Sequence, residues 1–156
     1  MGQGQLKAKK RKRQIAKVGD VFEIALPDGR FAYGRVYRDV GVAIYRRISR
    51  IPNTPPIGSR DFLFQVGMYR AVLTNCEVRI VGRDPFTKGE DEWPPPKCIK
   101  DVLSGGFEIY HKGKIRESSA TECKGLERSA VWDLHHIVDR ILHGKKSKYL
   151  KAVEGS

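Results

Sequence analysis

Hydrophobic and polar residues alternate near the start of the chain with the period of a β-strand. Phe22, Ile24 and Leu26 fall at every second position, which is the spacing of side chains on one face of a strand. Pro27-Asp28-Gly29 follows, and these residue types favour a tight turn. Alternation resumes at Phe31, so the pattern predicts a β-hairpin that opens an antiparallel sheet.

The same kind of pattern predicts further strands and a second hairpin. Clusters of proline separate the strands and indicate loops. A glycine inside a strand, Gly34, indicates a bulge or a close approach of another part of the chain. The predicted strands span about 20–27, 30–38, 41–48, 61–73 and 76–81, the second hairpin spans about 107–115, and the loops are 49–60 and 83–100.

The last part of the chain has a helical pattern. Apolar residues recur at spacings of three and four from Leu126 to Leu142, which predicts an amphipathic helix over about 128–143. Ser129 is a candidate N-cap, and His143-Gly144 is typical of a helix end. A sheet followed by a helix predicts an α+β fold: a strongly bent antiparallel sheet, open or closed into a barrel, with the C-terminal helix packed on it. The expected core comprises Phe22, Ile24, Phe31, Val36, Ile44, Phe64, Val66, Ile80, Leu134, Val138 and Ile141.

The positive charge of the chain lies mainly at its ends. The net charge is +12, but the central residues 18–144 carry only +2 of it. We therefore predict a disordered basic arm over 1–16, a single α+β domain over 17–144 and a basic C-terminal tail over 145–156. A domain close to neutral is unlike one that binds nucleic acid in a basic groove. Lys9–Arg13 attracts phosphate without reading sequence, and a solubilising role is favoured for it.

Other features of the composition indicate the cellular compartment of the protein. No run of about 18 apolar residues is present, so we expect no membrane partner. The three cysteines are odd in number and irregularly spaced, which argues against a disulfide framework and favours a reducing compartment. We expect a cytoplasmic protein.

An acidic run in the second proline-rich loop is the main candidate for partner binding. Glu90, Asp91 and Glu92 precede Trp93, and Pro94-Pro95-Pro96 stiffens the loop behind them. Tryptophan is favoured at interface hot spots, and acidic charge would steer a basic partner. For Trp93 itself, packing in the core is the favoured interpretation, because a buried tryptophan is commonly a packing residue.

The second predicted strand supplies two further candidates. Arg35 and Tyr37 alternate with neighbouring aromatic and basic residues and can form a surface stripe. Such a stripe is also found in proteins that bind single-stranded nucleic acid. A solvated strand face is the favoured explanation.

Metal and catalytic sites have little support in the sequence. His136, Asp139 and His143 fall at spacings that share one helix face, which makes them weak candidates for a metal site. No HExxH motif accompanies them, and a solvated polar face explains the pattern. We therefore predict no metal, no cofactor and no catalytic residue.

The hairpin also carries a resemblance to a known family. KVGDVFEIALPDGRFAYGRV at 17–36, followed by GVAIY at 41–45, resembles the opening of the Immunity protein 26 family of bacterial polymorphic toxin systems. The likeness continues in FLFQV at 62–66, VRIVGRDP at 78–85, WPPP at 93–96, FEIY at 107–110 and GLE at 125–127, and so covers roughly residues 17–143.

The resemblance implies a function. Members of that family resemble small α+β proteins encoded beside a toxin, which they bind and neutralise. We therefore expect an immunity protein that occludes a cognate protein toxin, with a nuclease as the favoured type. Some relatives carry a phosphotriesterase label, so a small metal-dependent phosphotriester hydrolase is one alternative. A nucleic-acid-binding module using the basic termini is another.

Overall fold

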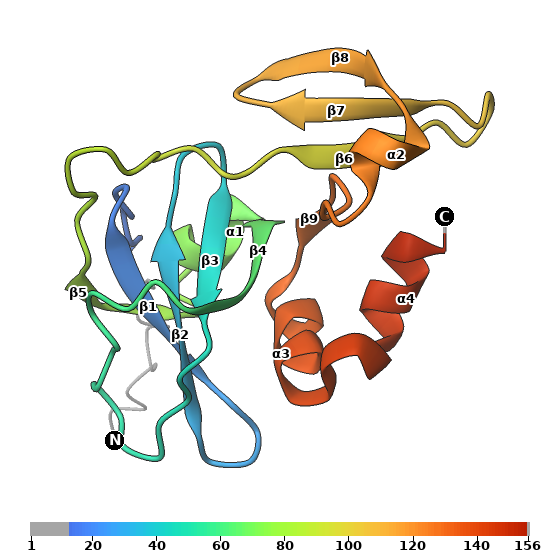
Figure 1. Cartoon of the computed structure of the whole chain (residues 1–156). Coiled ribbons are helices and arrows are strands. Elements are labelled where there is room, and N and C mark those ends of the chain that lie inside the picture. Colours follow the sequence, from blue (N-terminus) through green and yellow to red (C-terminus); the bar gives the residue numbers. More distant parts are fainter. Residues whose placement is uncertain (1–12, 156) are drawn as a thin grey trace, which may run out of the picture.

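The computed structural model describes residues 13–155, which form two mainly antiparallel sheets and several short helices (Figure 1). This α+β class is the predicted one. The strands are β1 (Asp20–Ala25), β2 (Phe31–Val36), β3 (Gly41–Tyr45), β4 (Phe62–Met68), β5 (Arg79–Arg83), β6 (Lys97–Lys100), β7 (Phe107–His111), β8 (Lys114–Ser118) and β9 (Val131–Trp132). The helices are α1 (Arg70–Thr74), α2 (Ala120–Cys123), α3 (Leu134–His143) and α4 (Lys148–Glu154), with a 3-10 turn at Gly144–Lys146.

The larger sheet has the strand order β5-β1-β2-β3-β4-β9 and stays open between β5 and β9, so it is not a barrel. The predicted hairpin of β1 and β2 is confirmed, with Val21 opposite Arg35 and Phe22 opposite Gly34. Its turn requires a residue in the left-handed backbone conformation, and Gly29 adopts it with φ of +84°.

The smaller sheet, β6-β7-β8, extends beside the larger one and is reached through the long segment that follows β5 (Figure 1). The hairpin of β7 and β8 falls where the sequence predicts it. β6 was expected to be loop, because it comes directly after a run of prolines. Cys98 and Ile109 form an opposed pair on one face and pack with Cys123 of α2.

The helix α3 is shorter than predicted and begins at Leu134. The preceding residues form β9, in which Trp132 pairs with Met68 in parallel register, so this segment joins the sheet. Asp133 therefore takes the N-cap position in place of Ser129. The predicted end is confirmed, since Gly144 follows the helix at φ +55°.

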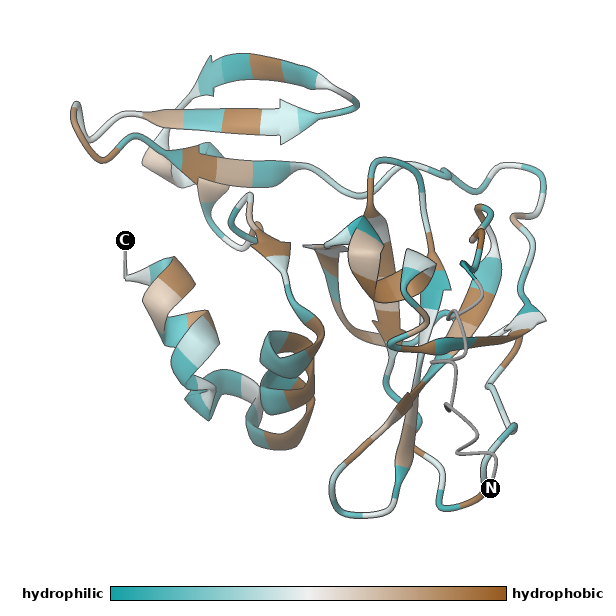
Figure 2. Cartoon of the chain, turned by 180° about the vertical axis from the view of Figure 1, so that it is seen from behind, coloured by the Kyte–Doolittle hydropathy of each residue, from teal (hydrophilic) through white to brown (hydrophobic). Residues whose placement is uncertain are grey.

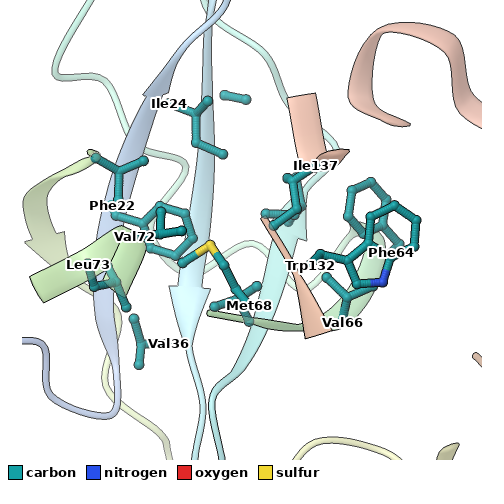
Figure 3. Close-up of a cluster of buried hydrophobic side chains, with 14 of the residues drawn as sticks. Phe22, Ile24, Val36, Phe64, Val66, Met68, Val72, Leu73, Trp132 and Ile137 are labelled. Atoms are coloured by element: carbon teal, nitrogen blue, oxygen red, sulfur yellow. The ribbon is translucent and has the colours of Figure 1, made fainter. Parts of the chain in front are cut away.

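One core lies between the larger sheet and α3 (Figure 3). Figure 2 shows the hydrophobic residues of α3 on the side that faces the sheet. Of the predicted core, Phe22, Ile24, Val36, Ile44, Phe64 and Val66 are buried, whereas Phe31, Ile80, Leu134, Val138 and Ile141 are only partly buried. Ile137 is the fully buried residue of α3. Strand β4 ends at Met68, and the remainder of the predicted strand is α1, which places Val72 and Leu73 in this core.

Segments near both ends of the described residues contact the rest of the structure. In the C-terminal segment, α4 places Leu150 in the main core. Of the predicted disordered arm, residues 1–12, which include most of Lys9–Arg13, lie outside the described residues. Gln14 in the described part donates to the carbonyls of Leu73 and Val78 at 3.1 and 3.0 Å, so this part of the arm is bonded to the domain. Within residues 13–155, no helix has the length and apolar character needed to cross a membrane.

Candidate functional site

The segment between β5 and β6 is held against the larger sheet by one buried arginine. Arg35 is fully buried, and its Nε donates to the Asp84 carbonyl at 2.8 Å. Its Nη2 donates to the Pro85 carbonyl at 3.1 Å, and its Nη1 donates to Glu90 Oε2 at 3.0 Å. The guanidinium also stacks on the Phe86 ring at 3.7 Å. Arg35 therefore holds this segment, which we name the acidic loop (84–96), both at its start and at Glu90.

A second arginine completes this ion network. Arg60 donates from Nη1 to Asp84 Oδ2 and from Nε to Glu90 Oε2, both at 2.9 Å. Tyr45 adds a hydroxyl that donates to Asp84 at 2.6 Å. Arg35 and Arg60 hold the pKa of Glu90 far below its usual range. Burial alone would raise the pKa of Asp84, but hydrogen bonds from Arg60 and Tyr45 lower it.

Three residues that the sequence offers for partner binding thus hold the loop in place. Arg35 is fully buried, and Tyr37 is 8% exposed with its ring edge-on to Phe86 at 4.8 Å. Both oxygens of Glu90 are bonded by arginines. Arg35 and Tyr37 therefore form neither a surface stripe nor a solvated face, because the loop covers them.

The rest of the acidic run faces solvent. Asp91 pairs with Lys112 at 3.0 Å, and Glu92 pairs with Arg38 at 2.9 Å. Trp93 is half-buried and lies outside the hydrophobic clusters of the described residues, so it is not a core residue. The Arg38 guanidinium stands over its ring at 5.5 Å.

Trp93 borders a groove of about 620 Å³ between the β2–β3 turn and α1. Most of its lining is apolar, and its charged residues are Arg38, Arg70 and Asp39. A groove of this size accepts a protruding side chain or a short apolar segment. Its apolar lining includes Val36, Val40, Val42, Met68 and Leu73.

A second exposed feature is the loop between β6 and β7, which is hydrophobic at its tip (Figure 2). Val102 and Leu103 are 80% and 98% exposed. The Asp101 side chain accepts hydrogen bonds from the Leu103 amide at 2.9 Å and from the Ser104 hydroxyl at 2.9 Å. The turn is therefore well ordered, although it presents apolar side chains to solvent. We name Val102 and Leu103 the apolar tip.

The histidines of α3 are arranged differently from the sequence-based candidate set. Asp139 accepts from the Ser147 hydroxyl at 2.7 Å, and His143 Nε2 stands 3.7 Å from Asp139. His136 instead groups with Asp133 and His135, whose donor atoms all lie within 4.8 Å of one another. Three such donors are the number that a transition metal with one open position uses.

Sequence reasoning missed two elements of this site. Arg60 and Asp84 complete the ion network, but their partners lie 24 to 49 residues away along the chain. The apolar tip had a local signal, because Asp101 and Ser104-Gly105 are turn-forming residues around two apolar ones.

The fold and site are those of a small α+β protein with an ordered acidic loop beside an apolar groove. Immunity protein 26 matches residues 17–109, which is more than half of the chain. The chain belongs to the Immunity protein 26 family. No curated protein and no solved structure matches it.

Proposed function

We propose that the chain binds a cognate bacterial toxin in the cytoplasm and neutralises it by occlusion, without turnover. Membership of the Immunity protein 26 family carries this proposal. The toxin type that best fits the acidic loop is a basic one, such as a nuclease, because exposed carboxylates steer a cationic partner.

The contact surface that we propose is centred on Asp91, Glu92 and Trp93, and the exposed apolar tip extends it. The two acids are in exposed ion pairs, which contribute little to stability and are readily exchanged for pairs with a partner's cations. Trp93 lies at the edge of the groove, where a partner can cover it. Glu90 holds the loop in one conformation, so binding costs little ordering entropy.

The decisive experiment compares how fast two charge-reversal variants associate with a toxin encoded by the neighbouring gene. Asp91→Lys with Glu92→Lys should slow association about tenfold or more at low salt, and the effect should shrink as salt rises. The matched control is Asp61→Lys with Glu122→Lys, which changes the net charge equally and breaks two exposed ion pairs elsewhere.

Two results would contradict the proposal. Equal slowing by both reversals would assign the effect to net charge alone, and no binding by the unaltered chain would remove the toxin as partner.

Deleting residues 1–12 should leave cell protection intact, because a basic arm has the wrong charge for a basic toxin. Loss of protection on this deletion would move the contact to the arm.

A further inference from the structure

A smaller cavity, of about 170 Å³, lies where the two sheets meet. The β2–β3 turn, the start of β6 and the β7–β8 turn surround it, and Figure 1 shows β6 beginning beside the larger sheet. Its polar lining comprises two lysines, one acid and three neutral polar residues: Lys97, Lys112, Asp39, Tyr110, His111 and Ser129.

Lys97 is the unusual member of this lining. It is only 6% exposed, yet none of the residues 13–155 forms a hydrogen bond or ion pair with its amine. Lysine is rarely buried without a partner, because its charge loses hydration there. In the register of the smaller sheet Lys97 lies opposite Tyr110, so both side chains project from the same face, away from the Cys98–Ile109 pair.

The two acids whose charges act most strongly on Lys97 already accept hydrogen bonds from other side chains. The Tyr110 hydroxyl donates to Asp39, and Arg140 forms two hydrogen bonds with Glu127. Burial lowers the pKa of Lys97, and the charges of Glu127 and Asp39 offset this only in part. The ammonium therefore lacks a counterion that makes direct contact with it.

The cavity wall also contains strained backbone. Asp39 and Val40 have φ of +55° and +52°, a region that a β-branched residue such as Val40 rarely adopts. The turn is held by the Met68 amide, which donates to the Val40 carbonyl at 2.9 Å. Strained residues of this kind cluster at ligand sites, where the surrounding structure enforces them.

We propose that this cavity binds a carboxylate group, with the Lys97 ammonium as its counterion. The cavity is smaller than the roughly 300–1,000 Å³ of sites for drug-sized ligands, so it fits a small acid or the end of one side chain. A carboxylate supplies the one negative charge that the Lys97 ammonium lacks, while the Tyr110 hydroxyl stays bonded to Asp39. The source of the carboxylate is either a free carboxylic acid or an Asp or Glu side chain of the partner protein.

The first test uses sodium acetate as the probe and the full chain. We expect the amide signals of Lys97, Tyr110 and Val40 to shift saturably in NMR spectra as acetate rises to about 100 mM, the range expected for so small a ligand. Sodium chloride at equal ionic strength should not reproduce the shifts. Lys97→Met should abolish them, and Lys100→Met, an exposed lysine of the same strand, should preserve them.

Acetate that behaves like chloride, or saturable shifts that persist in Lys97→Met, would overturn the proposal. If Lys97→Met fails to fold, the comparison of acetate with chloride in the unaltered chain decides by itself. A second arm, which rests on the proposed function, identifies the source of the carboxylate. Weaker toxin binding by Lys97→Met but not by Lys100→Met assigns the carboxylate to the toxin, and unchanged binding assigns it to a free acid.

Discussion

The ring of Phe22 lies directly over Gly34 on the neighbouring strand. The two residues are opposite each other in the register of β1 and β2, and a Cβ added to Gly34 would stand 2.2 Å from Cζ of Phe22. Phe22 is fully buried in the main core. The glycine thus provides the space for an aromatic ring where any larger residue would clash.

Gly34→Ala should therefore destabilise the protein by about 1–3 kcal/mol, the usual cost of overpacking a core. Gly82→Ala is the matched control, because the nearest atoms to its added Cβ are at ordinary contact distances of 3.6 and 3.7 Å. Urea unfolding of the three proteins measures the difference. Equal stability of Gly34→Ala and the unaltered chain would show that the ring can move aside.

The helix α3 offers a second comparison of packing. Ile137→Ala should cost about 2–5 kcal/mol, because Ile137 is fully buried between helix and sheet. Leu134→Ala should cost less, because Leu134 is only partly buried at the start of the helix. Thermal and urea unfolding give both values. A larger loss for Leu134→Ala would reverse this ranking.

Local signals predicted the parts of the fold that depend on local interactions. The two hairpins have alternating residues and turn residues close together in sequence, and the end of α3 has its glycine. The predicted start of α3 is wrong because Trp132 pairs with Met68, a residue far away in the sequence. This strand pairing outweighs the helical pattern of the segment. The sequence does not predict β6, because it comes directly after a run of prolines, which is typical of a loop.

The candidate site likewise contains residues that local sequence predicts and residues whose role depends on partners far away in the sequence. Exposed acids at Asp91 and Glu92 follow from a polar loop, and the structure has them at the surface. The role of Glu90 depends on Arg35 and Arg60, which are 55 and 30 residues away, and no local pattern identifies such partners. Arg35 resembled a surface residue in sequence because the loop that covers it follows much later.

The ion network makes stability depend on acid pH. Glu90 and Asp84 have pKa values lowered in the folded state, so their contribution is present above the unfolded values, near 4.5 and 3.8, and is lost as pH falls below them. The free energy of unfolding should therefore begin to decline near pH 5 and continue to decline as the pH falls toward the lowered folded-state pKa values.

Glu90→Gln should lower stability at neutral pH and make this decline shallower, because one of the two carboxylates is gone. Asp61→Asn, in an exposed ion pair with Arg46, should leave both properties nearly unchanged. Urea unfolding across the pH range gives the slopes. A decline equally steep in Glu90→Gln would exclude Glu90 as its source.

Two of the three cysteines, Cys76 and Cys123, should differ in reactivity. Burial and a hydrogen bond with Cys98 raise the pKa of Cys123 to about 11, whereas Cys76 is exposed. With that pKa, only about one Cys123 thiol in a thousand is ionised at pH 8, and the thiolate is the reactive form.

Iodoacetamide should therefore modify Cys76 well before Cys123 in the folded protein, and the rate at Cys123 should rise with pH. Peptide mapping by mass spectrometry follows each site. Unfolding in urea should remove the difference between them. Rapid modification of Cys123 in the folded state would contradict the burial of its thiol.

The apolar tip should affect binding without affecting stability. Val102 and Leu103 contribute little to folding because they are 80% and 98% exposed, so Val102→Ser with Leu103→Ser should leave the midpoint of thermal unfolding unchanged. The turn is already ordered by Asp101, so an apolar contact made there costs little entropy.

Under the proposed function, the double variant should weaken toxin binding by about tenfold, mainly through faster dissociation, because apolar contacts form after encounter. Ile51→Ser is a suitable control, since Ile51 is also exposed, at 65%, but lies on another loop. Binding kinetics of the three proteins distinguish the two surfaces. Equal dissociation rates in all of them would place the tip outside the interface.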